Sequence, residues 1–206
     1  MFYFLLKLFL APVVKELWVK EIKGLENFPA TGPVVVAANH TSYLDFFILA
    51  ALLPRRVYFL AGEVFFKKWW WYPLVKLTGQ IKVERYGGGD KSAVVNTAVE
   101  ILKQGKILGI FPEGTRSATG EIGSTFTGVA RIALAAQCSV VPVGINGAFT
   151  VWPRQKNQPN FKKAIIIKIG QPINLSQYYS VVASPEVLRK ITDEIVMGEI
   201  KKLLKY

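Results

Sequence analysis

The sequence is short of the residues that build metal centres and disulfide frameworks. Its 206 residues include one histidine, His40, and one cysteine, Cys138, and its aspartates are Asp45, Asp90 and Asp193. A single cysteine excludes an intrachain disulfide and is typical of a reducing compartment. These side chains are also too few and too scattered to form a metal-ligand cluster. We therefore expect neither a disulfide nor a bound metal.

Long uninterrupted apolar runs are missing, although 51% of the residues are hydrophobic and 13% are aromatic. The apolar start, residues 2–14, is broken by Lys7 and Pro12 and is too short to cross a hydrocarbon layer of about 30 Å. It also lacks the small-residue cleavage site of a secretory signal, so we expect it to be retained. Some of the apolar surplus should then lie on the surface.

Acidic residues are few relative to basic ones, with 14 Asp and Glu against 26 Lys and Arg, for a net charge of +12. Such a charge favours a partner that carries phosphate, namely a nucleic acid, an anionic bilayer or a phosphorylated substrate. No nucleic-acid recognition motif and no interleaving of arginines with aromatics is evident. We therefore expect a lipid surface or a phosphorylated small molecule, and no nucleic acid.

No Pro-, Gly- or Ser-rich linker divides the chain, and the apolar patterning predicts one α/β domain. Short β-branched runs of the kind buried in parallel sheets alternate with segments of helical period. Strands are expected at residues 19–23, 34–38, 57–61, 80–85, 106–111, 140–145 and 164–169, and helices at residues 43–53, 93–102, 128–136 and 185–204. We predict a largely parallel central sheet flanked by helices, preceded by an apolar, amphipathic N-terminal segment.

His40 follows the strand expected at residues 34–38, at the edge where open α/β sheets place ligands. A carboxylate on Nδ1 would hold the imidazole in one tautomer and leave Nε2 free to accept a hydroxyl proton. Asp45 can reach His40 only if the histidine precedes the helix and Asp45 lies in its first turn, because five helical positions are about 140° apart. Helix caps at Thr41 and Ser42 favour that arrangement. Alternatively, Ser42 and Asp45 form a variant capping box, and Asp45 serves only the helix terminus.

A second polar stretch directly follows the strand expected at residues 106–111. Gly114 permits a tight turn with exposed N–H groups, and Arg116 offers a planar fork suited to phosphate. Glu113 could orient Arg116 or contact a substrate hydroxyl. Arg85, at the end of the strand expected at residues 80–85, is a further candidate for phosphate binding. The alternatives are an ordinary turn with a surface ion pair and a solvated arginine.

Taken together, these stretches resemble the glycerolipid acyltransferase family, in particular its bacterial 1-acylglycerol-3-phosphate acyltransferases, over about residues 19–174. His40 and Asp45 match the H-x-x-x-x-D motif of the family, and Arg85 matches the arginine that closes its second motif. The E-G-T-R motif is matched by Glu113, Gly114, Thr115 and Arg116, and residues 140–143 look like the apolar fourth motif. One departure is that residues 124–128 lack the lysine that commonly precedes the glycine there in bacterial members.

The resemblance implies transfer of a fatty acyl group from an acyl carrier protein or coenzyme A thioester to the sn-2 hydroxyl of lysophosphatidic acid, without a cofactor or an acyl-enzyme. His40 would be the general base and Asp45 its orienting partner. The substrate-binding residues would be Arg85, Glu113, Gly114, Thr115 and Arg116. Glycerol 3-phosphate or another lyso-lipid remains open as the acceptor. So does a non-catalytic, basic lipid-binding module, although the retained His40–Asp45 pair argues against it.

A lipid acceptor requires contact with a bilayer, and two segments have a suitable composition. Residues 1–18 are apolar with lysines, and we expect them to form a membrane-interface helix ahead of an acyltransferase domain at residues 19–206. The second segment combines Lys67 and Lys68 with Trp69, Trp70 and Trp71. We therefore expect a peripheral or monotopic protein on the cytoplasmic face of the cell membrane. Either segment could instead belong to the core or to an oligomer contact.

Overall fold

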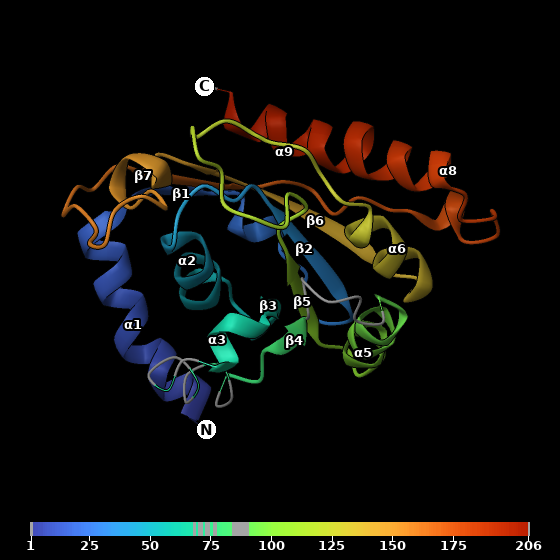
Figure 1. Ribbon diagram of the computed structural model, residues 1–206, viewed down its shortest axis with the longest axis horizontal. Coiled ribbons are helices and arrows are strands. Elements are labelled where there is room, and N and C mark those ends of the chain that lie inside the picture. The colour runs from blue at the N-terminus through green and yellow to red at the C-terminus, as the bar shows by residue number, and fades with distance from the viewer. Residues whose placement is uncertain are drawn as a thin grey trace.

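The computed structural model describes residues 2–67, 69, 72, 75, 78–83 and 91–205, and shows strands that alternate with helices (Figure 1). The strands are β1 (Val19–Lys23), β2 (Val34–Ala38), β3 (Val57–Gly62), β4 (Ile81–Val83), β5 (Ile107–Ile110), β6 (Ser139–Asn146) and β7 (Ile165–Ile169). The helices are α1 (Phe2–Trp18), α2 (Leu44–Leu52), α3 (Glu63–Lys67), α5 (Lys91–Lys103), α6 (Gly128–Ala135), α7 (Ala148–Val151), α8 (Pro185–Arg189) and α9 (Met197–Leu204). A π-helical stretch, Lys190–Val196, joins α8 to α9.

The strands form one sheet in the order β1-β7-β6-β2-β5-β3-β4. From β6 to β4 every neighbouring pair is parallel, whereas β7 runs antiparallel to β6 and parallel to β1. The prediction of a largely parallel sheet flanked by helices is therefore confirmed. Strand β2 lies in the middle, and all five of its side chains are buried. Burial on both faces explains why its sequence is uniformly apolar rather than alternating.

Helices cover both faces of the sheet (Figure 1). Successive side chains of β2 alternate between the two faces because a strand has a period of two. Val34 and Val36 pack in the core shared with α1 and α2. Val35 and Ala37 pack in the core formed with α5, α6 and the C-terminal helix. The order is therefore helix, sheet, helix, and the carboxyl end of β2 emerges between the two helical layers.

Helix α1 packs along α2 and leaves an apolar face uncovered. The Tyr3 hydroxyl donates to the Ala50 carbonyl at 2.8 Å, and Lys7 Nζ donates to the Pro54 carbonyl at 3.2 Å. The outer face carries the exposed side chains of Phe4, Leu5, Leu8, Phe9 and Val13. No helix within the described residues has both the length and the apolar character needed to span a bilayer.

The C-terminal helix begins as its sequence predicts. The Ser184 hydroxyl accepts the backbone N–H of Val187 at 3.3 Å, and Pro185 occupies the first turn. The helical conformation continues over residues 185–204. The π-helical stretch in its middle, which buries Ile191 and Thr192, has no signal in the sequence that we identified.

Candidate active site

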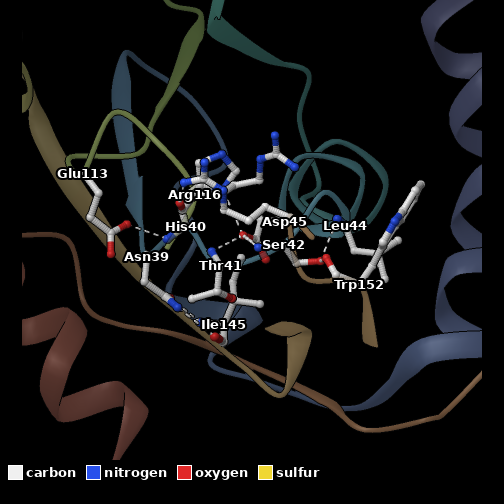
Figure 2. Close-up of polar contacts among 11 residues, drawn as sticks. Asn39, His40, Thr41, Ser42, Leu44, Asp45, Glu113, Arg116, Ile145 and Trp152 are labelled. Atoms are coloured by element: carbon white, nitrogen blue, oxygen red, sulfur yellow. Dashed lines mark hydrogen bonds and ion pairs between the residues drawn. The ribbon is translucent and has the colours of Figure 1, made fainter. Parts of the chain in front are cut away.

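Asn39 fixes the end of the central strand. Its side-chain Nδ2 donates to the Ile145 carbonyl at 2.9 Å, and the Ile145 N–H donates back to Oδ1 at 2.8 Å (Figure 2). The two bonds tie β2 to β6 at the carboxyl edge of the sheet, the edge where parallel sheets place ligands. His40 is the next residue, so these two hydrogen bonds of Asn39 also fix the position of its backbone.

The His40 and Asp45 side chains meet as the sequence predicts. His40 lies before α2 and Asp45 in its first turn, and Nδ1 is 2.9 Å from Oδ2. The Asp45 side chain is fully buried, while that of His40 keeps 15% exposure. Oδ2 can only accept from Nδ1, so Nδ1 carries a hydrogen and Nε2 holds the free lone pair of a neutral imidazole. The imidazole is therefore poised to accept a proton.

Asp45 also organises the turn that precedes its helix. The backbone N–H groups of Thr41 and Ser42 each donate to Oδ2 at 2.7 Å (Figure 2). The capping interpretation of Asp45 and the imidazole-orienting interpretation therefore describe the same oxygen atom. Because one atom serves both purposes, a change at Asp45 should affect both the stability of the turn and the orientation of the ring.

The Ser42 side chain anchors this turn to a distant segment. Its hydroxyl donates to the Trp152 carbonyl at 2.8 Å and accepts the N–H of Leu44 at 3.1 Å (Figure 2). The tilted rings of Tyr43 and Trp152 lie beside each other, with centroids 5.1 Å apart. Sequence reasoning missed Trp152, because it stands 110 residues after Ser42 and no local pattern signals the contact.

Aromatic stacking sets the plane of the imidazole. The His40 ring lies 4.0 Å from the Phe111 ring at an interplanar angle of 14°. Phe111 in turn stacks on Phe59, with centroids 5.9 Å apart. One face of the imidazole is thereby shielded from water, and the ring cannot rotate without losing the contact.

Glu113 bonds to the backbone of His40, a contact that the sequence does not reveal. Its Oε2 accepts the His40 N–H at 2.6 Å, and the residue is only 4% exposed (Figure 2). Burial raises the pKa of this carboxyl to about 7; the His40 N–H opposes the rise, and the nearby Asp45 adds to it. The Ser117 N–H also donates to the His40 carbonyl at 2.8 Å. The stretch from Glu113 to Ser117 therefore bonds both the N–H and the carbonyl of His40, and so joins the second motif to the first.

Gly114 forms the tight turn that its sequence predicts. Its φ of +65° lies in the left-handed region that favours glycine, and its N–H donates to the Phe111 carbonyl at 2.9 Å. A Cβ at this position would lie 3.0 Å from the Phe126 ring. Thr115, the next residue, is exposed. The turn is therefore held to Phe111, whose ring stacks on the imidazole, and Thr115 faces solvent.

Arg116 lies partly buried with unused hydrogen-bonding capacity. Its guanidinium carbon is 3.5 Å from the centroid of the Tyr43 ring, a cation–π contact. Its Nη1 is buried and has no hydrogen-bond partner among the residues described. A buried, unpartnered guanidinium nitrogen is uncommon in folded proteins, and a planar fork of this kind suits a phosphate. Arg116 therefore lies ready for an anionic ligand near His40.

The remaining residues singled out by the sequence are only partly described. Arg85, Lys68, Trp70 and Trp71 lie outside the described residues. The Trp69 side chain is 85% exposed. Lys67 is also exposed, and its Nζ pairs with Glu63 Oε2 at 2.9 Å one helical turn away.

The sequence is similar to those of known acyltransferases. A family model described as Acyltransferase matches residues 20–146. The chain is 30% identical over 186 residues to a 1-acyl-sn-glycerol-3-phosphate acyltransferase of Bacillus subtilis, covering 89% of this chain and 87% of that one. A chloroplastic 1-acyl-sn-glycerol-3-phosphate acyltransferase of Arabidopsis thaliana is 28% identical over 152 residues, which are 73% of this chain and 42% of that one.

A solved structure is similar along nearly the whole chain. The crystal structure of the 1-acyl-sn-glycerophosphate acyltransferase PlsC from Thermotoga maritima superposes with a TM-score of 0.77 at 25% identity, covering 98% of this chain and 79% of that one. The family model covers more than half of the sequence, and the Bacillus relative matches most of it. The chain therefore belongs to the 1-acyl-sn-glycerol-3-phosphate acyltransferase family.

Proposed function

We propose that this protein transfers a fatty acyl group from a thioester to the sn-2 hydroxyl of lysophosphatidic acid and so forms phosphatidic acid for phospholipid synthesis. The observation that carries this proposal is the contact of 2.9 Å between His40 Nδ1 and Asp45 Oδ2, which leaves Nε2 as a free base. The turn that carries Arg116 is bonded to the same histidine backbone. The Bacillus relative, similar over 89% of the chain, bears the name of this activity.

His40 acts as the general base. Its Nε2 takes the proton of the acceptor hydroxyl while the hydroxyl oxygen attacks the thioester carbonyl. When the tetrahedral intermediate collapses, the carbon–sulfur bond breaks and the imidazolium returns its proton to the departing thiolate. The new ester and a free thiol result, and no acyl-enzyme forms. General-base catalysis of this kind accelerates a reaction by about 10²- to 10⁴-fold, and Asp45 stabilises the imidazolium during the step.

Arg116 binds the phosphate of the acceptor. Its buried Nη1, which has no partner in the part of the chain that the structure describes, supports this role. So does its place three residues after Glu113, which bonds the His40 backbone. Gly114, Thr115 and Glu113 complete the substrate-binding turn. Arg85 contributes a second cation in this proposal, which for that residue rests on the family motif alone.

A small cavity lies between α1 and α2, too small to hold a whole fatty acyl chain. It measures about 100 Å³ and is lined mostly by apolar groups, among them Leu10, Phe46 and Ala50. The Phe46 ring lies 4.8 Å from the Phe59 ring, which stacks on Phe111 beside His40. A row of aromatic rings therefore connects the wall of the cavity to the proposed base.

The protein binds the cytoplasmic face of the cell membrane as a peripheral or monotopic enzyme. Residues 1–18 form the membrane-interface helix of this proposal, and residues 19–206 the acyltransferase domain. The uncovered apolar face of α1 supports it, as does Trp69 at 85% exposure. Lys67, Lys68, Trp70 and Trp71 complete the second contact. Apolar side chains mixed with lysines are typical of helices that lie in the head-group region.

The proposed activity is tested by offering the purified protein a panel of acceptors with both thioester carriers. The panel contains lysophosphatidic acid, glycerol 3-phosphate and lyso-lipids with other head groups, and products are identified by mass spectrometry. We expect phosphatidic acid from lysophosphatidic acid, and none with a folded His40→Ala variant. Acylation of another acceptor alone would reassign the substrate. Vesicle binding without any transfer would instead support a non-catalytic lipid-binding module.

A further inference from the structure

The loop at residues 153–163 concentrates positive charge beside the N-terminal helix. It carries Arg154, Lys156, Lys162 and Lys163, and its sequence contains no acidic residue. Figure 1 shows this orange loop, between α7 and β7, next to the end of α1 that lies farther from the N-terminus. Lys156 and Lys162 are exposed, whereas Lys163 Nζ pairs with Glu16 Oε2 of α1 at 3.2 Å. Lys156 and Lys162 therefore face solvent, and Lys162 directly precedes the residue that pairs with α1.

An exposed aromatic side chain of the loop is fixed against α1. Phe161 is 78% exposed, and its ring stacks on Trp18, the last residue of α1, with centroids 6.1 Å apart at 15°. The Trp18 indole N–H donates to the Asn160 carbonyl at 2.8 Å and holds the loop there. A large apolar ring kept at the surface and followed by the exposed Lys162 suits the head-group region of a bilayer.

The start of the same loop contacts the proposed substrate-binding turn. Arg154 Nη1 donates to the Arg116 carbonyl at 3.3 Å, and Gln155 Nε2 donates to the Ala118 carbonyl at 2.7 Å. The loop therefore joins the segment that carries Arg116 to the far end of α1. Whatever binds the loop is held close to the catalytic residues.

We infer that residues 153–163 bind an anionic phospholipid surface, with Phe161 at head-group depth and Lys156 and Lys162 directed toward lipid phosphates. This inference rests on the proposed membrane-surface function and adds a contact to it. Binding of the loop orients the Arg116 turn toward the head groups, where a lyso-lipid acceptor presents its phosphate. An acidic carrier protein would satisfy the lysines, but a bilayer also accounts for the exposed Phe161 ring, which is held against Trp18 at the end of α1.

The charged part of the contact is tested with two matched double variants that each remove two positive charges. Lys156→Gln with Lys162→Gln changes the loop, and Lys190→Gln with Lys201→Gln changes two exposed lysines of the C-terminal helix. Co-sedimentation is measured with vesicles of phosphatidylglycerol in phosphatidylcholine, and with phosphatidylcholine alone. The loop pair should weaken binding to the anionic vesicles by about 10- to 30-fold at low salt, and the control pair should change it by less than about threefold.

The apolar part is tested by Phe161→Ala, with Val182→Ala as its control. Val182 is 83% exposed in the loop before α8, at the other end of the molecule (Figure 1). Phe161→Ala should weaken binding by about tenfold, and the loss should persist at high salt because it does not depend on charge. Val182→Ala should leave binding unchanged.

Equal losses from the loop and the control variants would overturn the inference, because net charge alone would then explain them. It would also fail if the loop variants bound vesicles like the wild type but lost rate selectively with an acyl carrier protein thioester, a result that would assign the loop to the protein donor. Acyl transfer in detergent micelles reports on the proposed function separately. If the wild-type protein transfers no acyl group in micelles, yet the loop variants alone lose vesicle binding, the loop contact stands and the proposed activity fails.

Discussion

The carboxylate of Glu113 accepts the backbone N–H of His40 at 2.6 Å, although the two residues stand 73 positions apart. The sequence motif places Glu113 among the substrate-binding residues, yet its side chain bonds to the main chain of His40, the proposed base. It is buried, with only 4% of its surface exposed. A buried carboxyl of this kind couples the protonation of the site to the stability of the fold.

Replacement of Glu113 should change how stability depends on pH. Burial raises its pKa from the ordinary 4.5 to about 7, so between these values the folded chain holds a proton that the unfolded chain has released. The stabilisation is therefore complete below about pH 4.5 and is lost as the pH rises to 7, by about 3 kcal/mol in total. Glu113→Gln cannot titrate but can still accept the His40 N–H. The unfolding free energy of the wild type minus that of Glu113→Gln should therefore fall by about 3 kcal/mol between pH 4.5 and pH 7. Urea unfolding at several pH values measures this difference, and a difference that does not change with pH would reject the raised pKa.

Asp45→Asn should impair turnover and stability together, because one oxygen orients His40 and also accepts two backbone N–H groups. The amide oxygen of Asn can still accept both N–H groups but carries no charge, and because a neutral hydrogen bond contributes about 1 kcal/mol less than a charged one, the unfolding free energy should fall by about 1–2 kcal/mol. Turnover per folded molecule should fall by about 10²-fold or more as general-base catalysis weakens. Both quantities are measured on one preparation. A destabilised variant with full turnover would leave Asp45 as a helix cap only.

Arg116→Ala should weaken acceptor binding and spare the thioester. A hydrogen bond to a charged group contributes about 1.5–3 kcal/mol, which corresponds to a rise of roughly 10- to 100-fold in the acceptor KM. Arg131→Ala removes an exposed arginine of α6 and serves as the control. Steady-state kinetics with each substrate varied in turn distinguishes the two effects. An unchanged acceptor KM in Arg116→Ala would remove this residue from the phosphate site.

Local patterns predicted the parts of the structure that depend on near neighbours. The valine-rich run at β2 has the composition of a strand buried on both faces, and the spacing of His40 and Asp45 predicts a contact within one turn. Contacts between distant segments leave no such pattern. The bonds of Ser42 to Trp152 and of Glu113 to His40 depend on how the sheet brings loops together, so sequence reasoning missed both.

The edge of the sheet was likewise only partly predictable. Strand β7 is a short apolar run like the parallel strands, but it pairs antiparallel with β6. Alternation of apolar residues identifies a strand without giving its direction, because both directions place the same side chains on the same face. The short helix α7 between them was not predicted.

The central claim, that His40 is the general base, is tested most directly by acyl transfer in His40→Ala. The variant keeps the backbone N–H that Glu113 accepts and loses only the ring, and the sequence holds no other histidine to replace it. Transfer from the thioester to lysophosphatidic acid is measured beside circular dichroism and vesicle binding. We predict that transfer is abolished while the fold and vesicle binding are retained. A folded His40→Ala protein that transfers acyl groups at the wild-type rate would contradict the mechanism.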